Sequence, residues 1–91
     1  MIHTLTFFQV DDVRRFVGVF ATRGQPLRRR NGSRGAQILQ LADDPSRVAV
    51  LIAWDSKEAF EAFLKDQDAP ASMQASGVRS APKFEFLQAL A

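Results

Sequence analysis

The chain has 91 residues, so we expect one domain over residues 1–91 and no second domain. It contains no cysteine, which excludes disulfides, thiolate nucleophiles and thiolate metal sites. The formal net charge of +2 conceals an uneven distribution, because seven arginines and no acid lie between Val13 and Arg34.

The sequence carries no sign of membrane insertion or export. Its N-terminus lacks a basic leader followed by a long apolar core, so no signal peptide is predicted. The longest apolar run, Val48 to Trp54, is far too short to span a bilayer. With the absence of cysteine, this pattern predicts a soluble cytoplasmic protein that does not contact a membrane.

The first third of the chain predicts a strand and a helix. Ile2 to Val10 is rich in residues that suit a strand, with apolar side chains on both alternating faces. Asp11 or Asp12 is expected to cap a helix whose buried stripe has i, i+3, i+4, i+7 spacing (Val13, Phe16, Val17, Phe20). We expect Gly24 to end this helix, Pro26 to begin a further short turn and Asn31 to Gly35 to form a loop.

The middle of the chain predicts a hairpin. Ala36 to Leu41 is the second expected strand, and Arg47 to Trp54 is the third. The intervening "ADDPSR" has the composition of a turn, so the two strands should pair antiparallel.

A second helix and a last strand complete the pattern. Asp55 and Glu58 have capping-box spacing, with Ser56 as a competing cap, and the helix should bury one apolar stripe (Ala59, Phe60, Phe63, Leu64). A short helix around Ala71 to Ala75 and a strand from Lys83 to Leu90 follow.

This order predicts an α+β fold, the ferredoxin-like βαββαβ arrangement with an antiparallel sheet. Helices would cover only one face of such a sheet, yet the strands carry apolar residues on both faces. A second copy of the chain is the simplest cover for the other face. We therefore expect a homodimer with facing sheets.

Three segments resemble a known group of proteins: "VLIAWDSKEAFEAFL", "ILQLADDPSRV" before it and "SMQASGVRSAPKFEFL" after it. They are similar to the antibiotic-biosynthesis-monooxygenase-like superfamily, including small cyclase-like members, and the likeness extends over nearly all of the chain. It implies a half-barrel that pairs into a dimeric α+β barrel. It does not fix the reaction, because the superfamily includes oxygenases, cyclases, isomerases and haem-degrading enzymes.

The resemblance argues against one of these activities. Haem-degrading members have a tryptophan that matches Trp54, but they also use an asparagine on the first strand and a histidine on the second helix. The first strand here has no asparagine, and Phe63 and Leu64 occupy the region of that histidine. Cofactor-independent members bind an aromatic substrate through residues such as Trp, Asn and Arg, and the substrate itself then activates oxygen. Trp54 resembles one of those residues.

Three residues are candidates for catalysis or stacking, each with a simpler alternative. Trp54 ends a buried strand, so it either packs the core or forms the wall of a pocket that stacks on a planar ligand. His3, the only histidine, is the default acid–base candidate, unless it is a half-exposed residue at a strand end. Glu85 would be a buried base if its face of the last strand lines the barrel, and an ordinary solvent-facing carboxylate otherwise.

The arginine-rich segment has two interpretations as well. Arg28, Arg30 or Arg34 would hold an anionic group at a pocket mouth, or the segment is a solvated basic surface. Nucleic-acid binding is not expected, because it favours exposed aromatic residues among the arginines, and the nearby Phe16 and Phe20 belong to the buried stripe. One histidine without cysteine also predicts no metal site, and no other cofactor is expected.

Two functions of different classes therefore remain open. The first is a cofactor-independent monooxygenase or cyclase acting on a small aromatic or polyketide-like molecule. The second is a non-catalytic homodimer that binds a small aromatic or acidic ligand or has a structural role.

Overall fold

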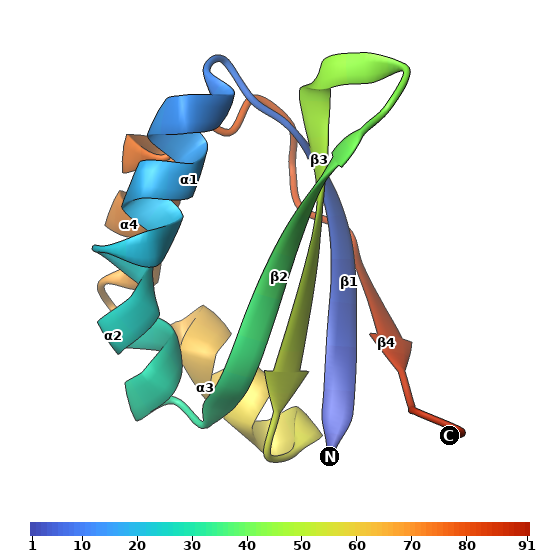
Figure 1. The fold of residues 1–91 in the computed structure, drawn as a ribbon. Helices are drawn as coiled ribbons and strands as arrows, with labels where there is room; N and C mark the ends of the chain where they lie inside the picture. Colours follow the sequence, from blue (N-terminus) through green and yellow to red (C-terminus); the bar gives the residue numbers. More distant parts are fainter.

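The structure is a computed structural model that describes residues 1–91, and it confirms the predicted fold class. Four strands form one antiparallel sheet in the order β2-β3-β1-β4, and the helices precede β2 and β4 (Figure 1). This is the ferredoxin-like α+β arrangement. The elements are β1 Ile2–Gln9, α1 Val13–Ala21, α2 Gly24–Arg30, β2 Ser33–Leu41, β3 Asp44–Trp54, α3 Lys57–Lys65, α4 Ala69–Ala75 and β4 Phe84–Leu87.

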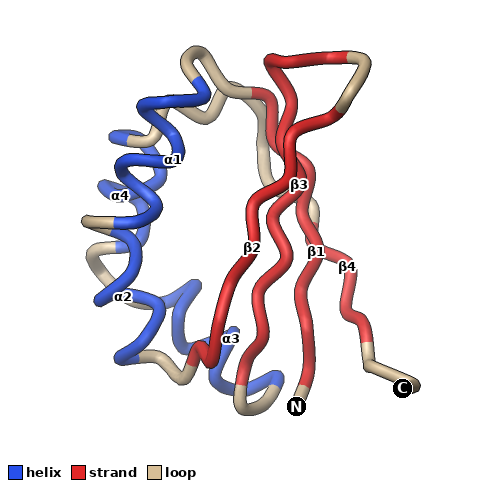
Figure 2. The backbone as a smooth tube through the Cα atoms, in the orientation of Figure 1, coloured by secondary structure: helices blue, strands red, loops and turns tan.

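All four helices lie on the same side of the sheet, and no helix covers the other side (Figure 2). The core fills the space between the two layers, because alternate residues of β1 and β3 point toward the helices. The burial of β3 shows which of its residues face the helices. Val48, Val50, Ile52 and Trp54 are buried, while Leu51 and Ala53 between them are only half-buried. The core cluster comprises Phe8, Val10, Phe16, Val48, Val50, Ile52, Trp54 and Phe60.

Polar side chains fix where the two longest helices begin. The carboxylate of Asp12 accepts hydrogen bonds from the backbone N–H groups of Arg14 and Arg15, at 2.9 and 3.3 Å. Of the two caps predicted for α3, Ser56 is the one used, and its hydroxyl oxygen accepts from the N–H of Ala59 at 3.1 Å. Both interactions satisfy donors that a helix start leaves unpaired.

Several predicted boundaries were wrong. Gly24 does not end a helix but begins α2, and α1 already stops at Ala21. The predicted loop from Asn31 to Gly35 is partly strand, because β2 continues back to Ser33, which pairs with Trp54. At the other end of the hairpin, β3 starts at Asp44, within the predicted turn. The last strand is limited to Phe84–Leu87.

Candidate functional site

A cavity lies between α1, α2 and the helix-facing side of β2. Its volume is about 550 Å³, within the range of sites that bind small molecules. Its wall contains three arginines and no carboxylate or histidine. The lining residues are Phe20, Ala21, Gln25, Arg28, Arg29, Ser33, Arg34, Gly35, Ala36 and Ile38.

A second, smaller and mainly apolar cavity adjoins the first. Its volume is about 70 Å³, and its walls come from the sheet and all four helices. Phe20 and Arg28 line both cavities, so they lie at the junction between a basic space and an apolar one. The other lining residues are Phe16, Val19, Gly24, Leu27, Ile52, Phe63, Ala69, Ser72, Met73, Ser76 and Phe84.

Arg28 is the most buried charged side chain in the protein, with 7% of its surface exposed. Its Nη1 donates to the carbonyl oxygen of Phe20 at 3.0 Å, and its guanidinium carbon lies 3.5 Å from the centre of the Phe20 ring. Burial lowers the pKa of Arg28 to about 10, so the side chain is still protonated at neutral pH. None of the four ion pairs in the structure involves it.

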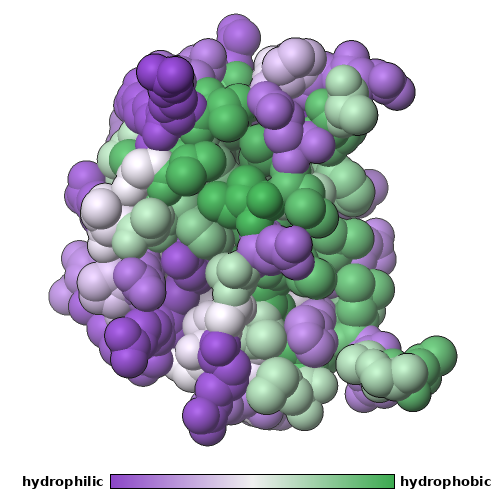
Figure 3. Space-filling view, viewed as in Figure 1, coloured by the Kyte–Doolittle hydropathy of each residue, from purple (hydrophilic) through white to green (hydrophobic).

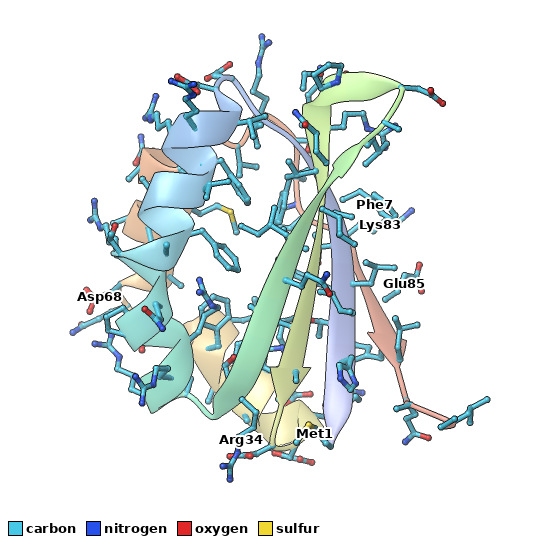
Figure 4. The ribbon with its side chains drawn as sticks, viewed as in Figure 1. Met1, Phe7, Arg34, Asp68, Lys83 and Glu85 are labelled. Atoms are coloured by element: carbon cyan, nitrogen blue, oxygen red, sulfur yellow. The ribbon has the colours of Figure 1, made fainter.

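Arg34 reaches the same cavity from the start of β2. The pairing of β2 with β3 shifts between Ser33 and Gly35, so Arg34 is the extra residue of a β-bulge. Its Nε donates to Asp55, the residue that follows β3, and this hydrogen bond raises the pKa of Arg34. Figure 4 shows Arg34 at the end of the molecule where α2 leads into β2. The bulge therefore directs a cation to the edge of the cavity.

Arg30 lies on the other side of α2 and lines neither of the two cavities. Its guanidinium donates to both oxygens of Asp66, at 2.9 and 2.6 Å, and to Asp68 at 2.8 Å. Asn31 also donates to Asp66, at 2.9 Å. These bonds tie α2 to the connection between α3 and α4, so Arg30 helps to position the helix that carries Arg28.

Asp66→Asn should lower the stability of the protein in a pH-dependent way. The hydrogen bonds from Arg30 and Asn31 depress the pKa of Asp66 below its ordinary value of 3.8. A carboxylate with a depressed pKa stabilises the folded state above its unfolded-state pKa, and this contribution is lost progressively as the pH falls from about 4 through the lower pKa of the folded state. Urea unfolding should therefore show a lower midpoint for the variant at pH 7, and the difference in midpoint should shrink steadily as the pH is lowered from about 4 to about 2.

Glu61→Gln is the matched control for that experiment, because Glu61 is exposed on α3 and takes part in no ion pair. Its midpoint should follow that of the unmodified protein at every pH in this range. Equal midpoints for the unmodified protein and Asp66→Asn at pH 7 would show that these bonds do not stabilise α2.

Trp54 is completely buried and lines neither of the two cavities. Its indole Nε1 donates to Oγ1 of Thr4 at 3.0 Å, so its one polar atom is satisfied inside the core. Its ring centre lies 5.5 Å from that of Phe60 and 5.1 Å from that of Phe63. Phe63 does line the apolar cavity, so Trp54 supports a wall of that cavity from behind.

His3 and Glu85 lie together, but on the opposite side of the sheet from the cavities. His3 pairs with Leu87 and Leu5 pairs with Glu85, which makes His3 and Glu85 diagonal neighbours on one face. Glu85 is exposed, and Figure 4 shows it pointing away from the helices, as Phe7 does. Within one chain, the sheet therefore separates both residues from a molecule bound in either cavity.

The sequence did not reveal how the cavities are walled. Gln25 and Ser33 line the basic cavity, and Ser72, Met73 and Ser76 line the apolar one. The small polar residues of α4 have no pattern that distinguishes a cavity wall from an exposed turn. The part of the sequence that indicated this site was the arginine-rich segment, because it contains Arg28 and Arg34.

Two further features bear on the class of protein. None of the helices is long and apolar enough to cross a membrane. No group of three or more His, Cys, Asp or Glu side chains is placed to hold a metal ion. The site is a pair of adjoining cavities, one apolar and one cationic, in a ferredoxin-like domain.

The comparisons with known proteins agree with this class. The sequence model described as antibiotic biosynthesis monooxygenase matches residues 1–75, and the chain belongs to that family. No curated protein matches the chain in sequence.

Solved structures show the same fold at low sequence identity. A protein from Bordetella bronchiseptica, titled a proposed antibiotic biosynthesis monooxygenase, superposes with a TM-score of 0.84 at 18% identity, covering 99% of this chain and 97% of that one. SnoaB, a cofactor-independent oxygenase from Streptomyces nogalater, superposes with a TM-score of 0.79 at 18% identity, covering 97% of this chain and 91% of that one. At such identities the likeness concerns the fold.

Proposed function

We propose that the protein binds a small planar aromatic molecule in the joined cavities and oxygenates it without a cofactor. The observation that carries this proposal is the junction at Phe20 and Arg28, where an apolar space meets a cationic one. The family of the chain supports the reaction, and SnoaB, which shares the fold, is titled a cofactor-independent oxygenase. An aromatic body would lie in the larger cavity against Phe20, with one edge at the small apolar end and its acidic oxygens facing the arginines.

The charges of the cavity define the role that the protein would have in such a reaction. Arginine side chains favour the anionic form of a phenol or an enolisable ketone. Neither cavity is lined by Asp, Glu or His, so water takes the proton and the substrate itself must be acidic. The resulting carbanion transfers an electron to O2, and the two radicals join as a peroxide, which takes up a proton. Loss of water then leaves a carbonyl, so CH2 and O2 become C=O and H2O.

Oxygen uptake with a panel of two- and three-ring polyphenols tests this proposal. We expect one O2 to be consumed for each substrate converted, with a rate that EDTA does not change. Ala36→Phe should lower the rate at least about tenfold, because Ala36 lines the basic cavity and a larger side chain would occupy it. Ala42→Phe, in the exposed turn between β2 and β3, is the control and should retain the rate.

The second candidate is a module that binds the same ligands without converting them. The observation in its favour is the lack of any carboxylate or imidazole base in the two cavities. Tight binding of polyphenols without oxygen uptake above the rate of the buffer would establish this function and exclude the oxygenase.

We also propose that two copies pair through the uncovered face of the sheet. Phe7, Leu39 and Leu87 are 46%, 49% and 40% exposed there, although they are large apolar residues. Figure 3 shows hydrophobic residues continuing to the edge of the molecule where this face begins. Two such faces related by a two-fold axis would cover each other, as stacked sheets do. The pair would also enclose His3 and Glu85 near its interface.

A further inference from the structure

Arg28 is the one charged residue that is buried, and its charge has no counter-ion in the protein. Arg30, Arg34 and Arg79 are exposed, and each is paired with an aspartate. Arg28 is buried, and only the neutral carbonyl of Phe20 accepts from it. A buried charge without an opposite charge is unfavourable, so proteins that retain one commonly use it at a site of function.

The guanidinium of Arg28 is held by two contacts with Phe20. The carbonyl oxygen of Phe20 fixes Nη1, and the Phe20 ring covers one planar face of the group. The group also occupies the space beside Gly24, because an added Cβ at that position would lie only 2.7 Å from Nη1. Any other residue at position 24 would therefore displace the guanidinium. This arrangement is a preformed site and not a flexible surface arginine.

The groups that remain free define the ligand. A guanidinium has five N–H donors, and Arg28 uses one of them within the protein. Because Phe20 covers a face of the group, a ligand approaches its edge, where parallel N–H groups match the two oxygens of a carboxylate. Arg29 lines the same cavity, whose wall has no acid, and Arg34 lines it too but is paired with Asp55, so the unpaired charges of Arg28 and Arg29 favour an anion.

We propose that Arg28 is the recognition site for the carboxylate of an aromatic carboxylic acid, which it binds through two parallel N–H···O bonds. The inference rests on the proposed function and narrows its substrate class to acids in which a carboxylate projects from a fused aromatic ring. The ring lies against Phe20 and the apolar cavity, and the carboxylate lies at the junction.

A matched pair of ligands tests this inference without requiring turnover. Titration calorimetry compares 2-naphthoate with 2-naphthamide, which have the same rings but differ in charge. We expect the protein to bind naphthoate at least about tenfold more tightly, since hydrogen bonds to charged groups exceed neutral ones by that order. Arg28→Gln should reduce the preference to about one, while Arg29→Gln, which removes a cation from the same cavity, should leave most of it.

A second pair of variants separates the position of Arg28 from its charge. Gly24→Ala keeps every charge but displaces the guanidinium, so it should lose the preference for naphthoate. Gly18→Ala is the control, because an added Cβ there meets nothing within 4 Å. Circular dichroism of each variant shows whether it is folded. If a variant does not fold, Arg28→Lys takes its place, because lysine retains the charge but lacks the two parallel donors of arginine.

The outcomes distinguish this inference from the proposed function. Equal affinity of the unmodified protein for both ligands would overturn the carboxylate site and leave an aromatic cavity in place. A preference that survives in Arg28→Gln would also overturn it. Binding of neither ligand at millimolar concentration would contradict both the carboxylate site and the aromatic cavity.

Discussion

Trp54→Ala should lower the free energy of unfolding by about 3–5 kcal/mol, the usual cost of removing a large aromatic side chain from a core. Trp54 has no exposed surface, and it contacts Phe60 and Phe63 between the sheet and α3. The variant would also leave the buried hydroxyl of Thr4 without its donor. Urea unfolding followed by circular dichroism measures the change.

Trp54→Phe provides the measurable intermediate if the alanine variant does not fold. Trp54→Phe should lower the free energy of unfolding by about 1–3 kcal/mol. The double variant with Thr4→Val should lose less stability than the two single variants lose in sum, because both partners of the hydrogen bond are then absent. Leu90→Ala, at a residue that is 98% exposed, is the control and should change nothing. Unchanged stability in Trp54→Phe together with lost ligand binding would make Trp54 a pocket residue.

Leu39→Glu should separate the proposed dimer. Leu39 of β2 and Phe7 of β1 both pair with Ala49 of the central strand β3, one from each neighbouring strand. Leu39 therefore lies on the same uncovered face of the sheet as Phe7 and Leu51. A two-fold axis would bring the new carboxylate into the interface twice, without a partner. We expect the dissociation constant of the dimer to rise at least about a hundredfold in native mass spectrometry or light scattering.

Leu64→Glu is the matched control for Leu39→Glu. Leu64 is 48% exposed, as Leu39 is 49% exposed, but it lies on α3 on the helical side of the sheet. This variant should remain a dimer. An unmodified protein that is monomeric at about 100 µM, a concentration far above a micromolar dissociation constant, would exclude the facing-sheet dimer.

The order of the elements was predictable because each has a strong local pattern. The stripe from Val13 to Phe20 and the apolar run from Val48 to Trp54 specify their elements without tertiary information. The boundaries at Gly24 and Ser33 were not predictable in this way. Gly24 lies beside the guanidinium of a residue four positions later, and Ser33 becomes strand because β3 extends far enough to pair with it.

The candidate site was predictable only in part. Sequence reasoning singled out Arg28 and Arg34, which line one cavity, but it grouped them with Arg30, which faces away from that cavity. Helical periodicity gives the side of α2 that a residue occupies, but α2 has only seven residues and no acidic partner of its own to orient it. The sequence did not decide whether Trp54 packs the core or forms a pocket wall, because a residue at the end of a strand can do either.

The cationic wall of the cavity comes from one short, continuous piece of chain. Arg28, Arg29 and Arg34 all lie between Gly24 and Ala36, whereas the aromatic wall is gathered from β4 and from α1 and α3. Ligand preference and fold are therefore encoded in largely separate stretches of sequence. Changes at Arg28, Arg29 or Arg34 alter the charge presented to a ligand without touching the core cluster, although Leu27 in the same stretch of 13 positions, counted from 24 to 36, is itself buried. Such separation lets members of one family diversify their ligands while keeping a common scaffold.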